Sequence, residues 1–361
     1  MKFNKKIGCV FFLILSMGCI AFISIGYFQR NKSYIQEPLT QLKHAKFKEE
    51  QFNLPDGDTI NYGTNNNKQK PALLLIHGQG MLWQDYAKVL PELGKHYQIY
   101  AIDCYGHGKS TWNKSKYSGK AHADDLHYFI QHLIKRKVTV AGHSSGGLIA
   151  AYLASKYPDD VSSLVLEDAP FFATEANRIR HTFSYQYGFK LYHDFKQQPN
   201  RQDEDFFAYS LKYNYFKSWF PKILWNKMSK DAIQQHKRNP NKPVHLTYLP
   251  PEINRLFEAE TYPFDYSFGE GFYDNSWFID YDHADILKGI KANTIFLKAQ
   301  DVTENGILIG ALTQKDAKRD VTLIPNSKLI QVDIRDHDTH YAKPDTYIRS
   351  ILSLDKKRFT P

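Results

Sequence analysis

The feature that most constrains this chain is the segment VTVAGHSSGGLIAAYLA, residues 138–154. Its first residues, VTVA, are typical of a short buried strand, and its last residues, LIAAYLA, are typical of a helix with little polarity. The serines and glycines between them predict a sharp turn from strand to helix. Such a turn can hold one side chain in a strained and exposed position, where it can act as a nucleophile.

Ser144 is the serine that fits this turn. The residues two positions before and two positions after the exposed side chain must be small, because the strand and the helix approach each other closely there. Ser144 has Gly142 and Gly146 at those positions. Ser145 has His143 on one side, and an imidazole is too large for that position. We therefore predict that Ser144 is the nucleophile.

Apolar strands alternate with helices around this segment. The strand pattern is clear in PALLLIHGQG (71–80) and VSSLVLEDAPFF (161–172), and AHADDLHYFIQHLIKRK (121–137) has the spacing of an amphipathic helix. Continuous apolar strands that alternate with helices predict an α/β fold, in which helices cover both faces of a mostly parallel sheet.

The alternation stops after Pro170 and resumes at ANTIFLKAQD, residues 292–301. The intervening residues are aromatic and polar and lack a strand rhythm, so we predict a cap domain inserted between two strands. The predicted organisation is an N-terminal membrane segment (1–32), a tether (33–46), the first part of the core (47–170), the cap (171–285) and the second part of the core (286–361).

The N-terminus has the pattern of a membrane segment. IGCVFFLILSMGCIAFISIGYF, residues 7–28, contains no charged residue and follows three lysines. The run is long enough to span a bilayer and longer than the apolar part of a typical cleaved signal. We expect an uncleaved signal anchor that leaves the rest of the chain outside the cytoplasm, because positive charge is denser before the span. A lipoprotein modified at Cys19 and a cleaved signal are the alternatives.

The net charge of +9 does not by itself point to nucleic acid. Five of the 47 Lys and Arg residues lie in residues 1–32, which contain no acid, so 42 basic residues face 38 acidic ones in the rest of the chain. No recognisable basic motif concentrates this excess, and we predict no nucleic-acid partner. Only Cys104 lies outside the N-terminal segment, so we expect no disulfide framework, and no Cys/His spacing predicts a zinc site.

Five motifs together resemble the α/β-hydrolase superfamily, over about residues 47–355. They are HGQG (77–80), IDCYGHGKS (102–110), GHSSGG (142–147), LVLEDAPFF (164–172) and DHDTHYAKP (336–344), and they occur in the order found in that superfamily. Within it, the chain looks like the capped bacterial hydrolases with a serine nucleophile. The resemblance implies a catalytic triad in the order serine, acid, histidine.

For the base, the resemblance implies His337, which stands seven residues before Pro344 at the start of the last predicted helix. His340 is the alternative, and we expect it to be a structural imidazole of the loop or the pocket wall.

For the acid, the resemblance implies a residue just after TIFLKA, residues 294–299, although the spacing departs from the family pattern by one residue. We favour Asp301, which follows this strand almost at once, over Glu304, which lies one short turn further on. Asp168 is a third candidate. We expect it to be a hydrogen-bonded loop residue at the hinge of the cap.

The resemblance also implies an oxyanion hole, in which two backbone N–H groups stabilise negative charge that develops on oxygen. Gln79 and Ser145 would supply these groups. We interpret His77, Asp103 and His107 as residues that brace the surrounding loops.

A serine at the turn disfavours the reactions of epoxide hydrolases and haloalkane dehalogenases, which use aspartate there. We predict a carboxylesterase or lipase that hydrolyses a small-molecule acyl ester through an acyl-enzyme, with no metal or organic cofactor. Carbon–carbon bond hydrolysis, acyl transfer and ligand binding without turnover are the alternatives on the same fold. The sequence leaves open the natural substrate, its acyl length and the oligomeric state.

Overall fold

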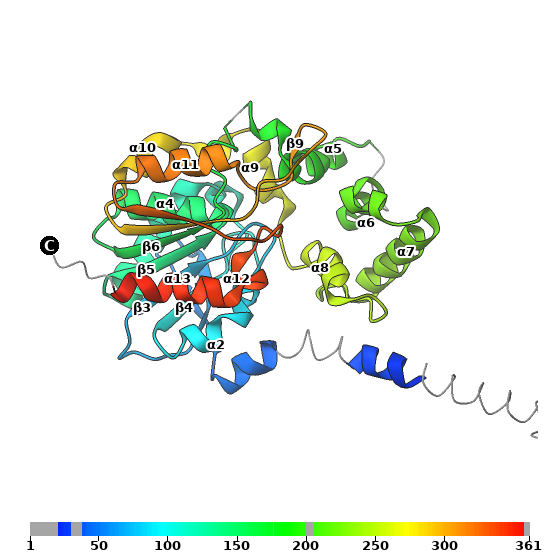
Figure 1. Cartoon of the computed structure of the whole chain (residues 1–361), viewed down its shortest axis with the longest axis horizontal. Coiled ribbons are helices and arrows are strands. Elements are labelled where there is room, and N and C mark those ends of the chain that lie inside the picture. The colour runs from blue at the N-terminus through cyan, green and yellow to red at the C-terminus, as the bar shows by residue number, and fades with distance from the viewer. Residues whose placement is uncertain (1–20, 30–37, 176, 200–204, 357–361) are drawn as a thin grey trace, which may run out of the picture.

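The computed structural model describes residues 21–29, 38–175, 177–199 and 205–356 (Figure 1). Its centre is an eight-stranded sheet with the spatial order β1-β2-β4-β3-β5-β6-β7-β10. The strands are β1 (Lys48–Asn53), β2 (Thr59–Thr64), β3 (Ala72–Ile76), β4 (Gln98–Ile102), β5 (Val138–His143), β6 (Val161–Glu167), β7 (Asn293–Lys298) and β10 (Ser327–Gln331). Strand β2 pairs antiparallel with both β1 and β4, and the other pairs are parallel.

The parallel strands are apolar along their whole length because helices cover both faces of the sheet. In β3 the side chains of Leu74 and Ile76 enter one apolar core, and those of Leu73 and Leu75 enter a second core on the opposite face. Each face therefore needs its own layer of helices. The predicted α/β fold with a mostly parallel sheet is confirmed.

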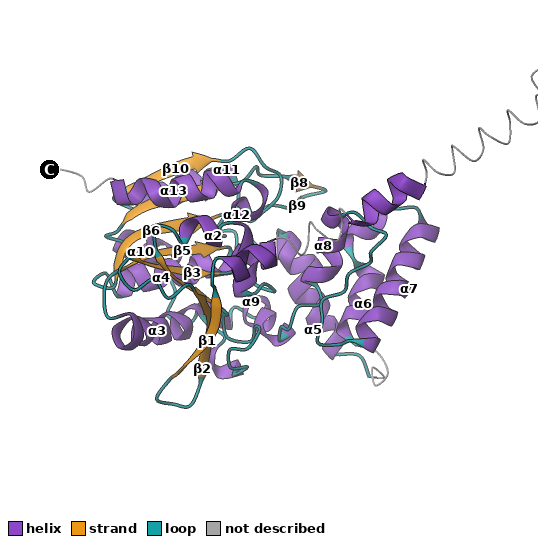
Figure 2. Cartoon of the chain, turned by 90° about the horizontal axis from the view of Figure 1, so that it is seen from below, coloured by secondary structure: helices purple, strands orange, loops and turns teal. Residues whose placement is uncertain are grey.

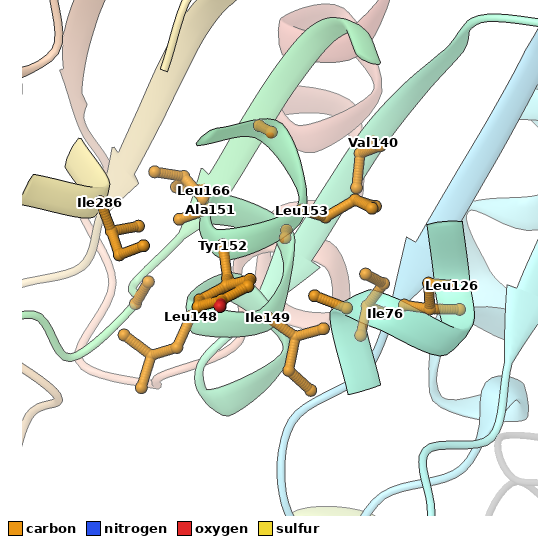
Figure 3. Close-up of a cluster of buried hydrophobic side chains, with 14 of the residues drawn as sticks. Ile76, Leu126, Val140, Leu148, Ile149, Ala151, Tyr152, Leu153, Leu166 and Ile286 are labelled. Atoms are coloured by element: carbon orange, nitrogen blue, oxygen red, sulfur yellow. The ribbon is translucent and has the colours of Figure 1, made fainter. Parts of the chain in front are cut away.

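The two helical layers differ in their contribution to the site. On the face of the first core lie α3 (Gly119–Phe129), α4 (Ser145–Lys156), α10 (His283–Gly289) and α11 (Gln314–Leu323), and on the other face lie α2 (Leu90–Leu93), α12 (Thr339–Ala342) and α13 (Pro344–Lys356) (Figures 1 and 2). Helix α4 packs Leu148, Ile149 and Leu153 among side chains of neighbouring strands and helices (Figure 3). Its burial on nearly every side explains why its sequence has so little polarity.

The chain between β6 and β7 forms the cap and part of the main core. Besides α10, the α-helices there are α5 (Lys190–Lys196), α6 (Phe206–Tyr213), α7 (Lys222–Arg238), α8 (Pro251–Ala259) and α9 (Glu270–Tyr273). Helices α6 to α8 lie to one side of the sheet and have a core of their own, which includes Phe207, Trp225 and Phe257 (Figure 1).

The last part of the predicted cap differs from this arrangement. Phe272, Trp277 and Tyr281 are buried in the main core, and the Tyr281 hydroxyl donates a hydrogen bond of 2.7 Å to the carbonyl of Leu148 in α4. The aromatic rings from Phe268 to Tyr281 therefore belong to the main core and not to the core of the cap.

Two short strands, β8 (Thr303–Glu304) and β9 (Ile307–Leu308), form a hairpin after β7. Within the described part of the chain, no helix is long and apolar enough to cross a bilayer. Most of the predicted anchor, residues 7–28, lies outside the described residues, and its last residues fall in a helix over 21–29.

Candidate active site

Ser144 occupies the predicted turn between β5 and α4. Its backbone has φ of 52° and ψ of −121°, a conformation that is strained for a residue with a side chain. A Cβ atom added to Gly142 would lie 2.3 Å from the carbonyl oxygen of Gly146, and one added to Gly146 would lie 2.2 Å from the carbonyl oxygen of Ile76. The prediction that the residues at positions 142 and 146 must be small is confirmed, and the structure leaves room for glycine alone.

His337 lies on the loop after β10 and its ring packs beside that of His143, the residue before Ser144, with the ring centroids 4.5 Å apart. The Nδ1 atom of His337 is 2.7 Å from Oδ2 of Asp168. Asp168 directly follows β6, the strand next to β5, and its carboxylate is fully buried. The structure thus brings His337 together with Asp168 next to the turn that holds Ser144.

The predicted pairing of His337 with Asp301 is wrong. Asp301 lies past the end of β7, and its Oδ2 accepts a hydrogen bond of 3.0 Å from the backbone N–H of Gln314, at the start of α11. Glu304 lies on the β8–β9 hairpin, where it accepts a hydrogen bond from the Tyr215 hydroxyl. Both carboxylates thus bond other groups, and Nδ1 of His337 bonds Asp168 instead.

A buried lysine stands at the end of β7, near the position expected for the acid. The side chain of Lys298 is fully buried, its Nζ is 3.6 Å from Oδ1 of Asp168, and it donates to the carbonyl of Ala299 at 2.5 Å. Asp168 therefore bonds His337 through one oxygen and faces a cation with the other. Sequence reasoning missed Lys298, although a lysine within the apolar strand TIFLKA was an available signal.

The charges around His337 favour its protonated form. Burial opposes protonation, but the hydrogen bond and charge of Asp168, together with the charges of Asp338 and Glu167, raise the pKa of His337 above its ordinary value of 6.5. The ring of the adjacent His143 forms no hydrogen bond, although its Nε2 lies 3.4 Å from Oδ1 of Asp338, and burial lowers its pKa to about 4. The surroundings thus raise the pKa of His337 and lower that of His143, although the two rings are neighbours.

The comparisons with known proteins agree with this fold. A family model described as alpha/beta hydrolase fold matches residues 71–247. These residues contain Asp168 and the turn between β5 and α4 that holds Ser144, which we call the elbow. The chain belongs to the α/β-hydrolase superfamily.

Similar proteins of this superfamily include lipases and esterases. Lipase 1 of Psychrobacter immobilis is 35% identical over 121 residues, which are 33% of this chain and 38% of that protein. An esterase structure from Exiguobacterium antarcticum superposes with a TM-score of 0.60 at 18% identity, and covers 86% of this chain and 100% of that one. A membrane phospholipase A superposes with a TM-score of 0.58 at 18% identity, and covers 97% of both chains.

The chain spans 29–41% of the length of the curated relatives that it matches. The structural similarities lie below 25% identity and support the fold. This chain is therefore a hydrolase-fold protein with lipases and esterases among its relatives.

The loop after β3 of this α/β-hydrolase lies against Ser144. A Cβ added to Gly78 would lie 3.1 Å from the Cβ of Ser144. The backbone N–H of Gly80 donates to Nε2 of His107 at 2.9 Å, and that of Met81 donates to the carbonyl of Gly78 at 3.2 Å. Within the described residues, the N–H of Gln79 has no acceptor. This N–H is therefore free to donate to an oxyanion.

Ser145 is the first residue of α4, so its N–H lies among the helix N-terminal groups that have no acceptor within the helix. The residues interpreted as loop braces have that role in the structure. Nε2 of His77 accepts the N–H of Cys104 at 3.0 Å, and Asp103 accepts the N–H of Trp83 at 2.8 Å. These bonds hold the loops on both sides of the candidate oxyanion hole.

A cavity of about 190 Å³ adjoins the loop that carries Gln79. Cap residues form most of its wall, and the lining is Gln79, Gly80, Met81, Tyr187, Gly188, Phe189, Tyr192, Phe206, Glu260, Phe264, Tyr266 and Gly269. At ~30 Å³ for each water molecule, the space equals that of about six waters. Half of the lining residues are aromatic, and burial raises the pKa of the one carboxyl in the wall, Glu260, to about 7. An apolar group of moderate size suits this cavity.

His340 is the centre of a second buried group of charges. Its Nδ1 is 2.9 Å from both carboxylate oxygens of Glu167, and its Nε2 is 2.9 Å from Oδ2 of Asp85. Burial lowers the pKa of His340, but the two carboxylates outweigh this and raise it to about 10. His340 is thus a structural imidazolium, as expected from the sequence.

Arg255 of the cap helix α8 completes this group. Its guanidinium forms an ion pair with Asp338, the residue after His337, and lies 3.7 Å from Asp85. It also stacks on the ring of Tyr341, 3.7 Å from the centroid. The cap therefore holds the loop of His337 from the outside, a contact that no sequence pattern indicated.

Asp85, His143 and His340 lie close enough for their donor atoms to surround a metal ion. The chemistry of this group does not suit a metal, because both nitrogens of His340 already bond carboxylates and its raised pKa keeps the ring protonated. A protonated imidazole has no lone pair to donate.

Proposed function

We propose that this protein is a serine hydrolase that cleaves carboxylic esters through an acyl-enzyme. The observation that carries the proposal is the strained Ser144 on the elbow, beside a histidine whose Nδ1 is bonded to the buried Asp168. Nucleophilic serine catalysis needs a base for the hydroxyl proton and an acid that orients the base.

In the proposed reaction, Ser144 Oγ attacks the ester carbonyl and its proton passes to His337. The N–H groups of Gln79 and Ser145 stabilise the oxyanion of the tetrahedral intermediate. Collapse of this intermediate breaks the bond to the alcohol, which takes the proton from His337. A water molecule then releases the acid by the same steps, and Asp168 stabilises the imidazolium throughout.

The charge balance of the buried groups supports this reaction. The group contains four acids, which are Asp85, Glu167, Asp168 and Asp338, and three cations, which are Arg255, Lys298 and protonated His340. While His337 is neutral, the group therefore has one negative charge more than it has positive charges. The cluster becomes neutral when His337 takes the proton from Ser144. The buried charges thus already favour the imidazolium that forms in the transition state. They lower the barrier to attack by Ser144 without having to reorganise during the reaction.

A fluorophosphonate probe tests the proposed chemistry, because it phosphonylates activated serines. We expect stoichiometric labelling of the full chain, with the adduct on the peptide that contains Ser144, and hydrolysis of p-nitrophenyl hexanoate that stops when labelling is complete. A chain that binds esters but neither hydrolyses them nor reacts with the probe would be a ligand-binding member of the fold.

The pH dependence tests the role of Lys298. The base must be neutral, so kcat/KM should fall as the pH drops through the pKa of His337, which lies above 6.5. In Lys298→Met the carboxylate of Asp168 loses its cationic neighbour, so it stabilises the imidazolium of His337 more strongly. The pKa of His337 then rises, and the acidic limb of the profile of kcat/KM against pH should move upward by about one pH unit.

The exposed Lys291 provides the matched control, and Lys291→Met should leave the limb in place. Thermal unfolding of both variants separates a titration effect from loss of the fold. An acidic limb that is unchanged or moves downward in folded Lys298→Met would contradict this role.

We further propose that residues 7–28 anchor the chain in the cell membrane, with the catalytic domain on the extracytoplasmic side. The uncharged run and the preceding lysines support this. Protease added to intact cells should then remove the folded domain while cytoplasmic markers survive. Protection of the domain until lysis would contradict the orientation.

A further inference from the structure

The basic residues of the cap are concentrated in one stretch. Residues 212–242 contain a single acid, Asp231, and eight basic residues, which are Lys212, Lys217, Lys222, Lys227, Lys230, Lys237, Arg238 and Lys242. The resulting net charge of +7 accounts for most of the charge of the whole chain. The stretch thus concentrates positive charge although it contains no recognisable basic motif.

Helix α7 turns these residues toward one side. Trp225, Met228 and Ala232 are buried in the core of the cap. Lys230, Lys237 and Arg238 are exposed, and by helical spacing they lie on the face opposite to the buried residues. Lys227 is paired with Asp231 at 2.5 Å, so the single acid of the stretch does not neutralise the other cations.

Large apolar side chains are exposed at the start of the same helix. Ile223 is 87% exposed, Trp219 is 62% exposed and Leu224 is 40% exposed. They are flanked by Lys217 and Lys222. We call Trp219, Ile223 and Leu224 the apolar tip, and Lys222, Lys230, Lys237 and Arg238 the basic face. Exposed apolar groups rimmed by cations are typical of surfaces that enter an anionic membrane interface.

A groove of about 710 Å³ between α6 and α7 continues this surface. Leu211, Trp225 and Ile233 supply apolar contacts, and Lys212 and Lys230 are among its basic lining residues. The groove thus offers the combination of an apolar floor and cationic walls that suits a lipid with an acidic headgroup. Helix α6 connects it to the candidate active site, because Phe206 at its other end lines the cavity near Gln79.

The N-terminal helix lies on the same side of the molecule. The hydroxyl of Tyr27 donates to the carbonyl of Tyr248 at 3.4 Å, and the hydroxyl of Tyr248 donates to Asp231 of α7 at 2.7 Å. Both views show the helix over residues 21–29 beside the cap (Figures 1 and 2). The described helix over residues 21–29 and α7 thus lie on the same side of the molecule.

We propose that the apolar tip and the basic face of α7 form a docking surface for an anionic lipid bilayer. The apolar tip enters the interface, and the basic face contacts acidic headgroups. Nucleic acid is the other polyanion that a basic helix could bind, but an isoleucine and a leucine at the exposed end suit acyl chains and have no counterpart in phosphate contacts. The docked cap would meet acyl esters that are dissolved in the membrane.

Quenching of Trp219 by brominated lipids tests the proposal on the full chain. The chain is reconstituted into vesicles of phosphatidylcholine, with or without phosphatidylglycerol, that contain a lipid brominated on its acyl chain. The difference between the unmodified chain and Trp219→Phe isolates the signal of Trp219. We expect strong quenching in the anionic vesicles and little in the neutral ones. The exposed Trp112 of the core is the control, and Trp112→Phe should leave the quenching in place.

Two surface variants separate the apolar and electrostatic contributions. Ile223→Asp should abolish the quenching of Trp219, whereas Ile279→Asp, at an exposed isoleucine of the core, should not. Replacing the four residues of the basic face with glutamine should weaken docking by about fivefold for each charge near the surface. The matched control replaces four exposed lysines of the core with glutamine, which are Lys291, Lys315, Lys318 and Lys328.

Three results would overturn the proposal. The first is equal quenching of Trp219 in neutral and anionic vesicles, and the second is equal quenching in the basic-face variant and its core control. The third is binding of an oligonucleotide that depends on the basic face while Trp219 remains unquenched. None of these measurements uses ester hydrolysis, so the docking proposal can fail independently of the proposed reaction.

Discussion

Replacing Ser144 with alanine is expected to lower kcat for p-nitrophenyl hexanoate by about 10⁶-fold and to abolish labelling by a fluorophosphonate. Removal of the nucleophile of a serine triad has an effect of this order, because the remaining groups cannot form the acyl-enzyme. Alanine fits the position, since it removes only the hydroxyl from a backbone that already has φ of 52°. Measured kcat and the mass of the labelled protein provide the two readouts.

Ser145→Ala is the matched control for this prediction. Its side chain is buried, and the role proposed for Ser145 uses the backbone N–H, which alanine retains. The variant should therefore keep its labelling and most of its activity. Loss of labelling in Ser145→Ala but not in Ser144→Ala would move the nucleophile by one residue and contradict the assignment.

The elbow could be predicted because its requirements are local. The close approach of Gly142 to Gly146 follows from one strand, one turn and one helix that are consecutive in the sequence. The apolar strands could be predicted for a similar reason, because burial of both faces of a parallel sheet leaves continuous apolar runs. These features needed no knowledge of distant contacts.

The partner of His337 could not be predicted in this way. Asp168 and Asp301 both follow apolar strands, and those strands are neighbours in the sheet. The choice depends on where each carboxylate points after its strand ends. The chain at Asp168 adopts φ of 43° directly after β6, with its N–H bonded to the carbonyl of Leu297 in β7, and this turns the side chain inward. No pattern in the sequence predicts this backbone conformation at Asp168.

The contacts between the cap and the core were also beyond the sequence. Arg255 lies 83 residues before Asp338, and their ion pair forms only when the cap is folded against the loop of His337. The excess of basic residues in 212–242 can be counted in the sequence, but the surface that they form depends on the fold of the cap. The residues of the basic face are spread among aromatic and apolar side chains, and they share one surface only after α7 has formed.

Replacing Asp168 with asparagine is expected to lower kcat by about 10⁴-fold while the chain remains folded. An amide in this place can hold the imidazole in the wrong tautomer and cannot stabilise the imidazolium, and an effect of this order is known for the serine triad. Asp301→Asn removes a carboxylate of the same size from the loop after β7, where it bonds the N–H of Gln314, and should change kcat by less than about threefold. The pair of variants compares the buried carboxylate at the end of β6 with the exposed one after β7. A large loss in Asp301→Asn together with a small loss in Asp168→Asn would show that the hydrogen bond of His337 to Asp168 is not the one used in turnover.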